Sequence, residues 1–391
     1  MRMNQEEQYK ESVPALLLWY AYNARVLPWR EDPTPYHVWI SEIMLQQTRV
    51  DAVRGYYERF LTELPDIPSV AEASEDRLVK LWEGLGYYSR VRNIAKAARV
   101  LCETYGGNLP ADYALLRSLP GIGEYTAGAI ASIAFGLPVP AVDGNALRVY
   151  ARLTGYRDDI RSESFKRQVR DRLAATIADY ISSENDSFSP KDPDTAEGTV
   201  PGRFNQAVMD LGATVCVPNG KPHCDVCPLS HLCTAFRQDL TGEIPAKPAG
   251  KAKPVEKKTV LVIRDGDRVL LRRRPKSGLL AGMWEFPNVT GHLSSAGAKK
   301  AAEEISGIVP ARAKRLPDSR HRFSHVEWLM RGYTVFADGT TERGARPETG
   351  EHFPKEDDGT GENTEFVWVT AEQITAEYGI ATAFRTYLLQ L

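Results

Sequence analysis

The first 235 residues or so carry apolar residues at helical spacing and no strand pattern. Near the start, Val13, Leu16, Leu17 and Tyr20 recur at positions i, i+3, i+4 and i+7, which predicts an amphipathic helix over residues 9–24. Similar patterns predict further helices at 36–57, 69–73, 75–83, 90–105, 112–118, 126–135, 146–153 and 204–213. We therefore expect this part of the chain to be an all-helical domain.

The hydrophobic period changes to that of strands after about residue 257. Two short runs, 258–263 and 268–273, flank Asp265-Gly266-Asp267, which is a hairpin signal. Further strands are expected at 284–286, 326–336 and 365–370, and helices at 296–306 and 371–378. The second domain is therefore predicted to be α+β.

Polar and glycine-containing segments mark the boundaries. The stretch 238–256 is rich in proline, glycine and lysine and is typical of a linker. We predict a helical domain over 1–237, this linker, and an α+β domain over 257–391. Segments 182–201 and 338–363 are expected to be surface loops, disordered in the first case and mobile in the second.

One turn in the helical region presents free backbone amides. Leu119-Pro120-Gly121-Ile122-Gly123 reads as a turn that opens a helix, with both glycines expected to allow positive φ and close backbone approach. N–H groups at a helix start are suited to bind an anion. Downstream, Asp143 precedes the helix predicted at 146–153 and, taken alone, reads as an ordinary cap.

Charge and composition limit the possible partners and the expected location of the protein. With 49 basic and 51 acidic residues the formal net charge is −2, so a polyanionic partner would have to be held by a local basic patch. Residues 1–10 are polar and no apolar run is long enough to span a bilayer. We expect a soluble, cytoplasmic protein.

Four of the five cysteines are clustered: Cys216, Cys224, Cys227 and Cys233. In a chain without an export signal, such a cluster indicates a metal site rather than disulfides. Only one Cys-x2-Cys pair is present and the gaps are unequal, whereas structural zinc sites usually use two close pairs. The spacing favours an iron–sulfur cluster over zinc. Cys102 lies in a helical pattern and is expected in the core.

Several motifs together resemble the helix-hairpin-helix glycosylases of base-excision repair, and within them the MutY adenine glycosylase family. The hairpin, here 112–136, Asp143 and the four-cysteine loop at 216–233 carry the first likeness. The second rests on segments 27–30, 41–48, 84–90, 142–145 and 204–207. The resemblance implies a [4Fe–4S] cluster on the four cysteines, and a monomer that binds double-stranded DNA with A:8-oxoguanine or A:G mispairs. The family's first cysteine gap is usually six residues, whereas here it is seven, which we expect a bulge to absorb.

The resemblance implies roles for Glu42, Asp143, Tyr125 and Asn145. Glu42 is flanked by Ile40 and Ile43, so that burial would raise its pKa and suit a general acid. Asp143, at a helix start, is expected to stay ionised and to face the developing sugar cation. Without the resemblance, Glu42 reads as a surface or ion-paired residue. Asn145 and Tyr125 resemble residues that position the carboxylates and the sugar, although a cap or core role is the plain alternative.

Tyr125 also separates this chain from bifunctional relatives. Endonuclease III-like enzymes carry a lysine at the matching hairpin position, which forms a Schiff base with the sugar. A tyrosine there predicts a monofunctional glycosylase that leaves an abasic site. The resemblance further implies an adenine pocket formed by Arg25, Leu27, Trp29, Arg30, Leu45 and Gln206. It places Gln47 and Tyr87 as wedges in the base stack, and Gly121 and Gly123 at a phosphate.

The second domain resembles the NUDIX-related domain of the same family. A NUDIX hydrolase needs several acidic metal ligands on one helix, but Ala301 and Ile305 stand at two of these positions. We therefore predict loss of pyrophosphatase chemistry. The loop Phe323-Ser324-His325 resembles the family's reader of 8-oxoguanine. A local basic patch is expected from Arg272, Arg273, Arg274, Lys276, Arg320 and Arg322.

Three other functions remain open from the sequence. An endonuclease III-like glycosylase/lyase, including one of the thymine-glycol type, is disfavoured by Tyr125. A non-catalytic iron–sulfur DNA-binding protein would not need Glu42 or Asp143, and both are present. A nucleotide pyrophosphatase is disfavoured by the missing acidic residues.

Overall fold

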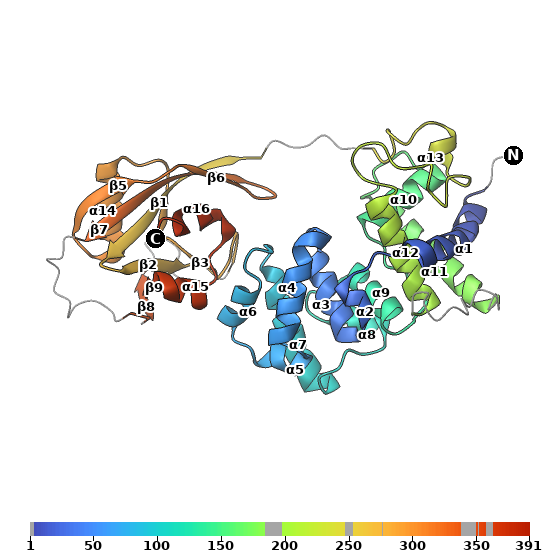
Figure 1. The fold of residues 1–391 in the computed structure, drawn as a ribbon, viewed down its shortest axis with the longest axis horizontal. Helices are drawn as coiled ribbons and strands as arrows, with labels where there is room; N and C mark the ends of the chain where they lie inside the picture. Colours follow the sequence, from blue (N-terminus) through green and yellow to red (C-terminus); the bar gives the residue numbers. More distant parts are fainter. Residues whose placement is uncertain are drawn as a thin grey trace. The chain divides into compact units, whose positions relative to one another are not determined.

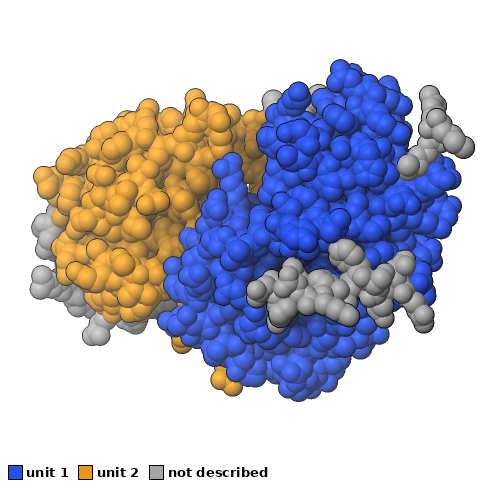
Figure 2. Space-filling model, turned by 45° about the vertical axis from the view of Figure 1, so that its right-hand side comes forward, with its two compact units in different colours: residues 1–71, 96–250 blue, residues 72–95, 251–391 orange. Residues whose placement is uncertain are grey.

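The computed structural model describes residues 4–183, 198–246, 253–275, 277–337, 349–350, 352–356 and 363–391. The chain forms two compact units (Figure 2). Unit 1 comprises residues 1–71 and 96–250, and unit 2 comprises 72–95 and 251–391. The units thus differ from the expected division in one segment, because residues 72–95 cluster with the C-terminal part. The domain boundaries at 238–256 stay a prediction.

All regular elements that precede β1 in the described residues are helices, as expected (Figure 1). Helices of unit 1 are α1 (Gln5–Asn23), α2 (Pro28–Glu31), α3 (Pro35–Leu45), α4 (Val50–Glu63), α5 (Ile67–Glu72), α8 (Tyr113–Ser118), α9 (Glu124–Ile133), α10 (Gly144–Thr154), α11 (Glu163–Ser182), α12 (Val200–Thr214) and α13 (Thr234–Arg237). Helix α6 (Glu75–Leu81) belongs to unit 2, and α7 (Ser89–Tyr105) begins there and ends in unit 1. None of the described helices combines the length and apolarity that a bilayer crossing requires.

Three sequence expectations need correction in unit 1. The helix predicted over 36–57 is two helices, because Gln47 adopts φ 57° between α3 and α4. Helix α11 was not predicted, since its buried residues are few among many charged ones. The predicted loop at 182–201 is helical at both ends, where α11 finishes and α12 starts, and residues 184–197 lie outside the described residues.

The hairpin joins α8 to α9 largely as its sequence predicts. The Asp112 side chain caps α8, and Gly121 adopts φ 77° in the turn. Gly123 differs from the expectation: its φ of −86° is open to any residue, and it serves as the N-cap of α9. The space beside Gly123 is open, since a Cβ added there would meet nothing within 4 Å. With no side chain at this position, the start of α9 is left uncovered.

Tight packing fixes the segment that leads into α10. A Cβ added at Gly128 in α9 would stand 2.5 Å from the carbonyl oxygen of Pro140. The buried side chain of Asn205 in α12 accepts a hydrogen bond from Ala141 N (2.9 Å) and donates to Val139 O (2.9 Å). Helices α9 and α12 therefore clamp residues 139–141 between them, two residues before Asp143.

Unit 2 contains one mixed sheet in its described part, with the order β5-β7-β1-β2-β9-β8 (Figure 1). Strands β3, β4 and β6 pair with β2, β1 and β7. The strands are β1 (Val255–Asp265), β2 (Arg268–Arg273), β3 (Trp284–Glu285), β4 (Asn288–Thr290), β5 (Pro310–Arg315), β6 (Ser319–Arg322), β7 (Glu327–Ala337), β8 (His352–Glu356) and β9 (Asn363–Thr370). The predicted β1–β2 hairpin is confirmed, with Asp265 opposite Arg268 and Gly266 at φ 64°.

The sheet is covered on both faces. Tyr333 and Val335 belong to a core formed with α14 (Ser295–Ser306). On the other face Gly332 lies against the ring of Tyr387 in α16 (Arg385–Leu388). Helix α15 (Ala371–Ala376) follows β9 and contacts it. Burial of both faces explains the continuous apolar runs of these strands. The loop predicted over 338–363 is wrong at 352–356, where β8 pairs with β9; residues 338–348 lie outside the described residues.

Substitution Gly128→Ala is expected to destabilise unit 1 by about 1–3 kcal/mol, because the new methyl group has no room against Pro140. Gly55→Ala is the matched control: this exposed position in α4 has nothing within 4 Å of the added atom, so helix propensity predicts a gain of about 0.5–1 kcal/mol. Urea unfolding followed by circular dichroism measures both. Equal stability of the two variants would contradict the packing described here.

Candidate active site

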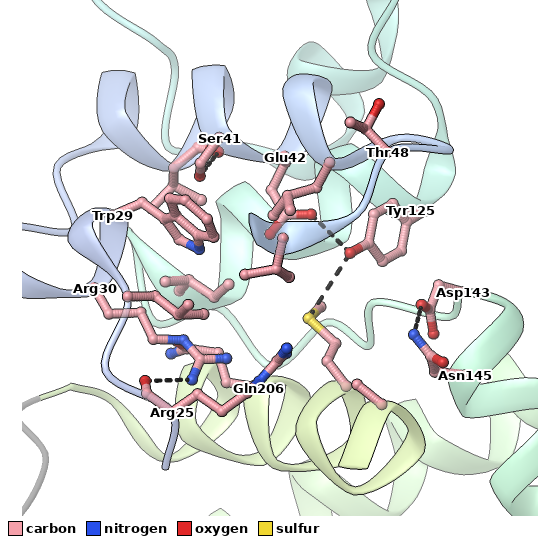
Figure 3. A pocket seen from close by; sticks show the side chains of 17 residues that line it. Arg25, Trp29, Arg30, Ser41, Glu42, Thr48, Tyr125, Asp143, Asn145 and Gln206 are labelled. Carbon is pink, nitrogen blue, oxygen red and sulfur yellow. Dashed lines mark hydrogen bonds between the residues drawn. The ribbon is translucent and has the colours of Figure 1, made fainter. Parts of the chain in front are cut away.

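A cavity of about 180 Å³ in unit 1 brings together side chains from distant parts of the sequence (Figure 3). It gathers all ten residues that the sequence assigned to catalysis and to the adenine pocket: Arg25, Leu27, Trp29, Arg30, Glu42, Leu45, Tyr125, Asp143, Asn145 and Gln206. The sequence reasoning missed the rest of the lining, namely Val38, Ser41, Thr48, Val50, Ile133, Met209 and Ala213. The roles of the ten residues stay predictions.

Glu42 is buried in the wall of this cavity, on α3, with 5% of its surface exposed. Its Oε2 atom accepts a hydrogen bond from the Tyr125 hydroxyl at 2.7 Å (Figure 3). The pKa of Glu42 is raised to about 7, chiefly by burial and also by the nearby charge of Asp143, while the Tyr125 hydrogen bond and Arg30 oppose the rise. The carboxyl group is therefore able to hold a proton near neutral pH, as a general acid must.

Asp143 caps α10 as its sequence position predicts. Its Oδ1 accepts from Ala146 N (2.8 Å), and its Oδ2 accepts from the Asn145 side-chain amide (2.7 Å; Figure 3). These donors favour the ionised form. Burial nevertheless outweighs them and raises the pKa of Asp143 above its ordinary value, which the sequence did not predict. Unlike Glu42, Asp143 receives N–H donors that stabilise a carboxylate.

A buried arginine links this aspartate to the cysteine loop. Arg148 in α10 donates to Asn145 Oδ1 (2.7 Å), to the backbone oxygen of Gly212 (2.7 Å) and to that of Cys216 (2.8 Å). Asn145 is held from the other side by Gly212, where a Cβ would come within 2.5 Å of its side chain. The orientation of Asn145, and through it that of Asp143, thus depends on packing against the last turn of α12.

The four cysteines lie in the segment from the end of α12 to the start of α13. None forms a disulfide. The pKa of the Cys227 thiol is raised to about 12, chiefly by burial and also by the charges of Cys216, Cys233 and Cys224, while a backbone hydrogen bond from Leu229 opposes the rise. Arg152 donates to Cys216 Sγ at 3.2 Å. In the described residues, no three His, Cys, Asp or Glu side chains are grouped to hold a single metal ion. Four cysteines within one loop are nevertheless the kind of ligand set that iron–sulfur clusters use.

The additional residue in the first cysteine gap is accommodated in a closed turn. Gly220 adopts φ 78°, and His223 N donates to Val215 O at 3.0 Å, so the segment after Cys216 folds back before Cys224. Gln8 of α1 fastens the other end of the loop by donating to Leu232 O (2.8 Å).

The residues predicted to contact DNA occupy strained turns. Gln47, between α3 and α4 in unit 1, is exposed with φ 57°. Tyr87, in unit 2, is 45% exposed with φ 48°. A non-glycine residue with positive φ is uncommon and costly, and such positions concentrate at functional sites. The expected amides at Gly121 and Gly123 lie at the start of α9, where both glycines are exposed.

Within unit 2, the loop between β6 and β7 borders a second cavity of about 560 Å³. Phe323, Ser324 and His325 line it together with Tyr87. The Phe323 ring packs edge-on against Trp328, with ring centroids 4.8 Å apart. Ser324 and His325 are exposed, so their polar atoms can reach a ligand.

The predicted basic patch is largely neutralised by ion pairs. Arg272 and Arg274 both bind the fully buried Glu285 at 2.7 and 2.8 Å, and Arg273 binds Asp76 and Glu365. Arg320 and Arg322 both bind Glu327. Lys276 lies outside the described residues. These arginines therefore serve unit 2 internally as much as they supply surface charge.

The chain matches two protein families. Residues 40–175 match the HhH-GPD superfamily of base excision DNA repair proteins, and residues 259–390 match the NUDIX domain. The adenine DNA glycosylase of Mus musculus is 35% identical over 399 residues, which cover 86% of this chain and 74% of the mouse protein. That of Homo sapiens is 35% identical over 403 residues, covering 87% and 70%.

Among solved structures, a thermostable thymine-DNA glycosylase matches with 25% identity and a TM-score of 0.49, covering 59% of this chain and 98% of that one. The expected two-part fold, a helix-hairpin-helix glycosylase domain followed by a NUDIX-like domain, is confirmed by the two family matches. Since the mouse and human relatives align along most of both chains, this chain belongs to the MutY family of adenine DNA glycosylases.

Proposed function

We propose that this protein removes adenine from DNA where it is mispaired with 8-oxoguanine or guanine, by hydrolysing the N-glycosidic bond and leaving an abasic site. The observation that supports this most is the convergence of Glu42, Tyr125 and Asp143 on one cavity. The relatives that match along most of the chain are named adenine DNA glycosylases. An adenine inside a duplex cannot reach such a cavity and has to be flipped out first.

Glu42 supplies the proton in this proposal. Adenine leaves poorly as an anion, so protonation at N7 converts it into a neutral leaving group. The pKa of Glu42, about 7, leaves a large protonated fraction at neutral pH. The Tyr125 hydroxyl holds Oε2 and thereby orients the carboxyl group.

Asp143 supplies the opposing charge. As the C1′–N9 bond breaks, the sugar becomes an oxocarbenium-like cation that a carboxylate can stabilise, as in glycoside hydrolysis. The N–H donors from Ala146 and Asn145 favour the ionised form of Asp143. Water then adds to C1′ and gives up a proton to the Glu42 carboxylate, which regenerates the acid. No lysine stands at the Tyr125 position, so we infer that a Schiff base is not formed and that the strand is left intact.

The loop Phe323-Ser324-His325 is our candidate reader of 8-oxoguanine. It lines a cavity large enough for a base, with an aromatic ring for stacking and two exposed polar side chains for hydrogen bonds. Degeneration of the acidic NUDIX motif at Ala301 and Ile305 fits a domain that recognises a base and does not hydrolyse a nucleotide.

The four cysteines would hold a [4Fe–4S] cluster. When bound, such a cluster would cross-link the loop through its four cysteines and would supply one-electron redox chemistry. Arg148 and Arg152 of α10 hold the backbone and sulfur of Cys216, so the loop is joined directly to the helix that Asp143 caps. We further infer that the protein acts as a monomer on duplex DNA.

Excision of adenine tests the proposal. Purified protein incubated with an A:8-oxoguanine duplex and then treated with alkali should give a nick at the adenine, and much less nicking without alkali. Glu42→Gln should slow excision about 10²–10⁴-fold, since it removes the proton donor. Glu58→Gln, an exposed glutamate in α4, is the matched control and should keep the wild-type rate. Intact adenine after prolonged incubation of the wild type would overturn the proposal.

Recognition of the opposite base is tested by binding. In the Glu42→Gln background, in which excision is slow enough for binding to be measured, Ser324→Ala or His325→Ala should weaken binding to A:8-oxoguanine up to about tenfold for each lost hydrogen bond. Binding to A:G duplexes should change less. Ser295→Ala, exposed at the start of α14, provides the control. A loss of the same size for both duplexes would argue against a reader role.

Metal analysis tests the cysteine site. Protein purified without oxygen should be brown, with roughly four irons and no zinc per chain. Cys224→Ser should lose iron, whereas Cys102→Ser, outside the loop, should retain it. Stoichiometric zinc in the wild-type protein would show that the spacing was misinterpreted.

A further inference from the structure

A fully buried acid lies behind the cavity and has no part in the mechanism above. Asp210 is on α12, one turn beyond Gln206, and its side chain has no exposed surface. No sequence motif points to Asp210, because a lone aspartate in a helix is usually a surface residue. A buried carboxylate has to be paired, so its partners indicate what it does.

Asp210 binds both arginines of the cavity. Oδ1 accepts from Arg25 Nε (2.8 Å) and Arg30 Nη2 (2.9 Å). Oδ2 accepts from Arg30 Nη1 (2.8 Å) and from the backbone N–H of Arg25 (3.1 Å). Arg30 also donates to the backbone oxygen of Arg25 at 3.1 Å. The Arg30 pair is bidentate, which fixes the plane of its guanidinium group.

These hydrogen bonds occupy N–H donors of both guanidinium groups that line the cavity. Arg25 and Arg30 keep only 28% and 15% of their side-chain surface exposed. Burial alone would raise the pKa of Asp210, but the hydrogen bonds and charges of Arg30 and Arg25 outweigh it and hold the pKa below its ordinary value. Asp210 is thus a permanent negative charge behind two positive ones.

We propose that Asp210 is a positioning residue for base excision, which orients Arg25 and Arg30 along the cavity wall and offsets their charge so that the bound adenine can accept a proton. This inference rests on the proposed function. A base protonated at N7 and a cationic sugar would both be repelled by uncompensated guanidinium groups at close range, because the low dielectric of a closed site strengthens such repulsion. Asp210 reduces that repulsion without standing in the cavity itself.

Through Arg30, Asp210 also bears on Glu42. The charged and titratable groups that influence Glu42 are Tyr125 from α9, Asp143 at the start of α10 and Arg30 from α2. The hydrogen bond from Tyr125 and the charge of Arg30 both favour the carboxylate, and Arg30 is the group that Asp210 pairs with. Without Asp210, more of the Arg30 charge would be felt by Glu42, whose pKa would fall. A general acid acts while protonated, so its activity is present below its pKa and is lost as pH rises through it. A lower pKa therefore moves this loss to lower pH.

The test is the pH dependence of single-turnover adenine excision between about pH 5 and pH 9. Wild-type activity should fall as pH rises through about 7. Asp210→Asn should shift that midpoint down by about one unit, the size of effect expected when a carboxyl gains an uncompensated arginine neighbour, and should lower the rate at pH 8 about tenfold. Glu58→Gln, the exposed control in α4, should leave the midpoint unchanged.

Further variants separate charge from packing. The double variant Asp210→Asn/Arg30→Gln should bring the midpoint back toward the wild-type value even where the absolute rate stays low. Asp210→Glu, which keeps the charge, should shift it little. If Asp210→Asn does not fold, Arg30→Gln alone should raise the midpoint above that of the wild type. An unchanged midpoint in the folded Asp210→Asn variant, or in Arg30→Gln, overturns the inference, whereas a wild type that leaves adenine intact overturns the proposed function.

Discussion

The burial of one carboxyl group shapes the candidate active site. Glu42 lies on α3, where the neighbouring residues Ile40 and Ile43 are almost completely buried. Burial of the carboxyl group raises the free energy of its ionised form. A folded protein accepts such a group only where its surroundings support it. Here the support comes from a hydroxyl at 2.7 Å and from a cavity whose walls belong to segments scattered over nearly 190 residues of sequence.

Two carboxyl groups share that cavity and differ in what they contact. Glu42 accepts a hydrogen bond from the Tyr125 hydroxyl, whereas Asp143 caps a helix and accepts hydrogen bonds from the N–H groups of Ala146 and Asn145. Burial raises the pKa of both. The N–H donors around Asp143 nevertheless favour its charge, and that charge in turn favours the protonated form of Glu42. This asymmetry fits the roles proposed for the two acids, with Glu42 as the proton donor and Asp143 as the carboxylate that faces the sugar cation.

The sequence predicted those features that repeat or that sit at element ends. Apolar periodicity gave most helices and the β1–β2 hairpin, and Asp143 was predicted as a cap because caps are local. Helix α11 and strand β5 were missed, since both carry mainly polar residues and their places are set by long-range packing. The resemblance supplied the residues of the cavity. Neither the sequence pattern nor the resemblance pointed to Asp210, because its partners at positions 25 and 30 are some 180 residues away.

The division of the chain into units bears on how recognition and chemistry are distributed. Tyr87, proposed to wedge into the base stack, and Phe323, proposed to read the opposite base, line one cavity within unit 2. The proposed acid and the cation-stabilising carboxylate both lie in unit 1. Helix α7 belongs to both units, since it begins beside Tyr87 in one and ends in the other. The residues proposed to sense the mispair and those proposed to break the bond thus belong to different compact units, and the chain passes between these units within α7 as well as near residue 250.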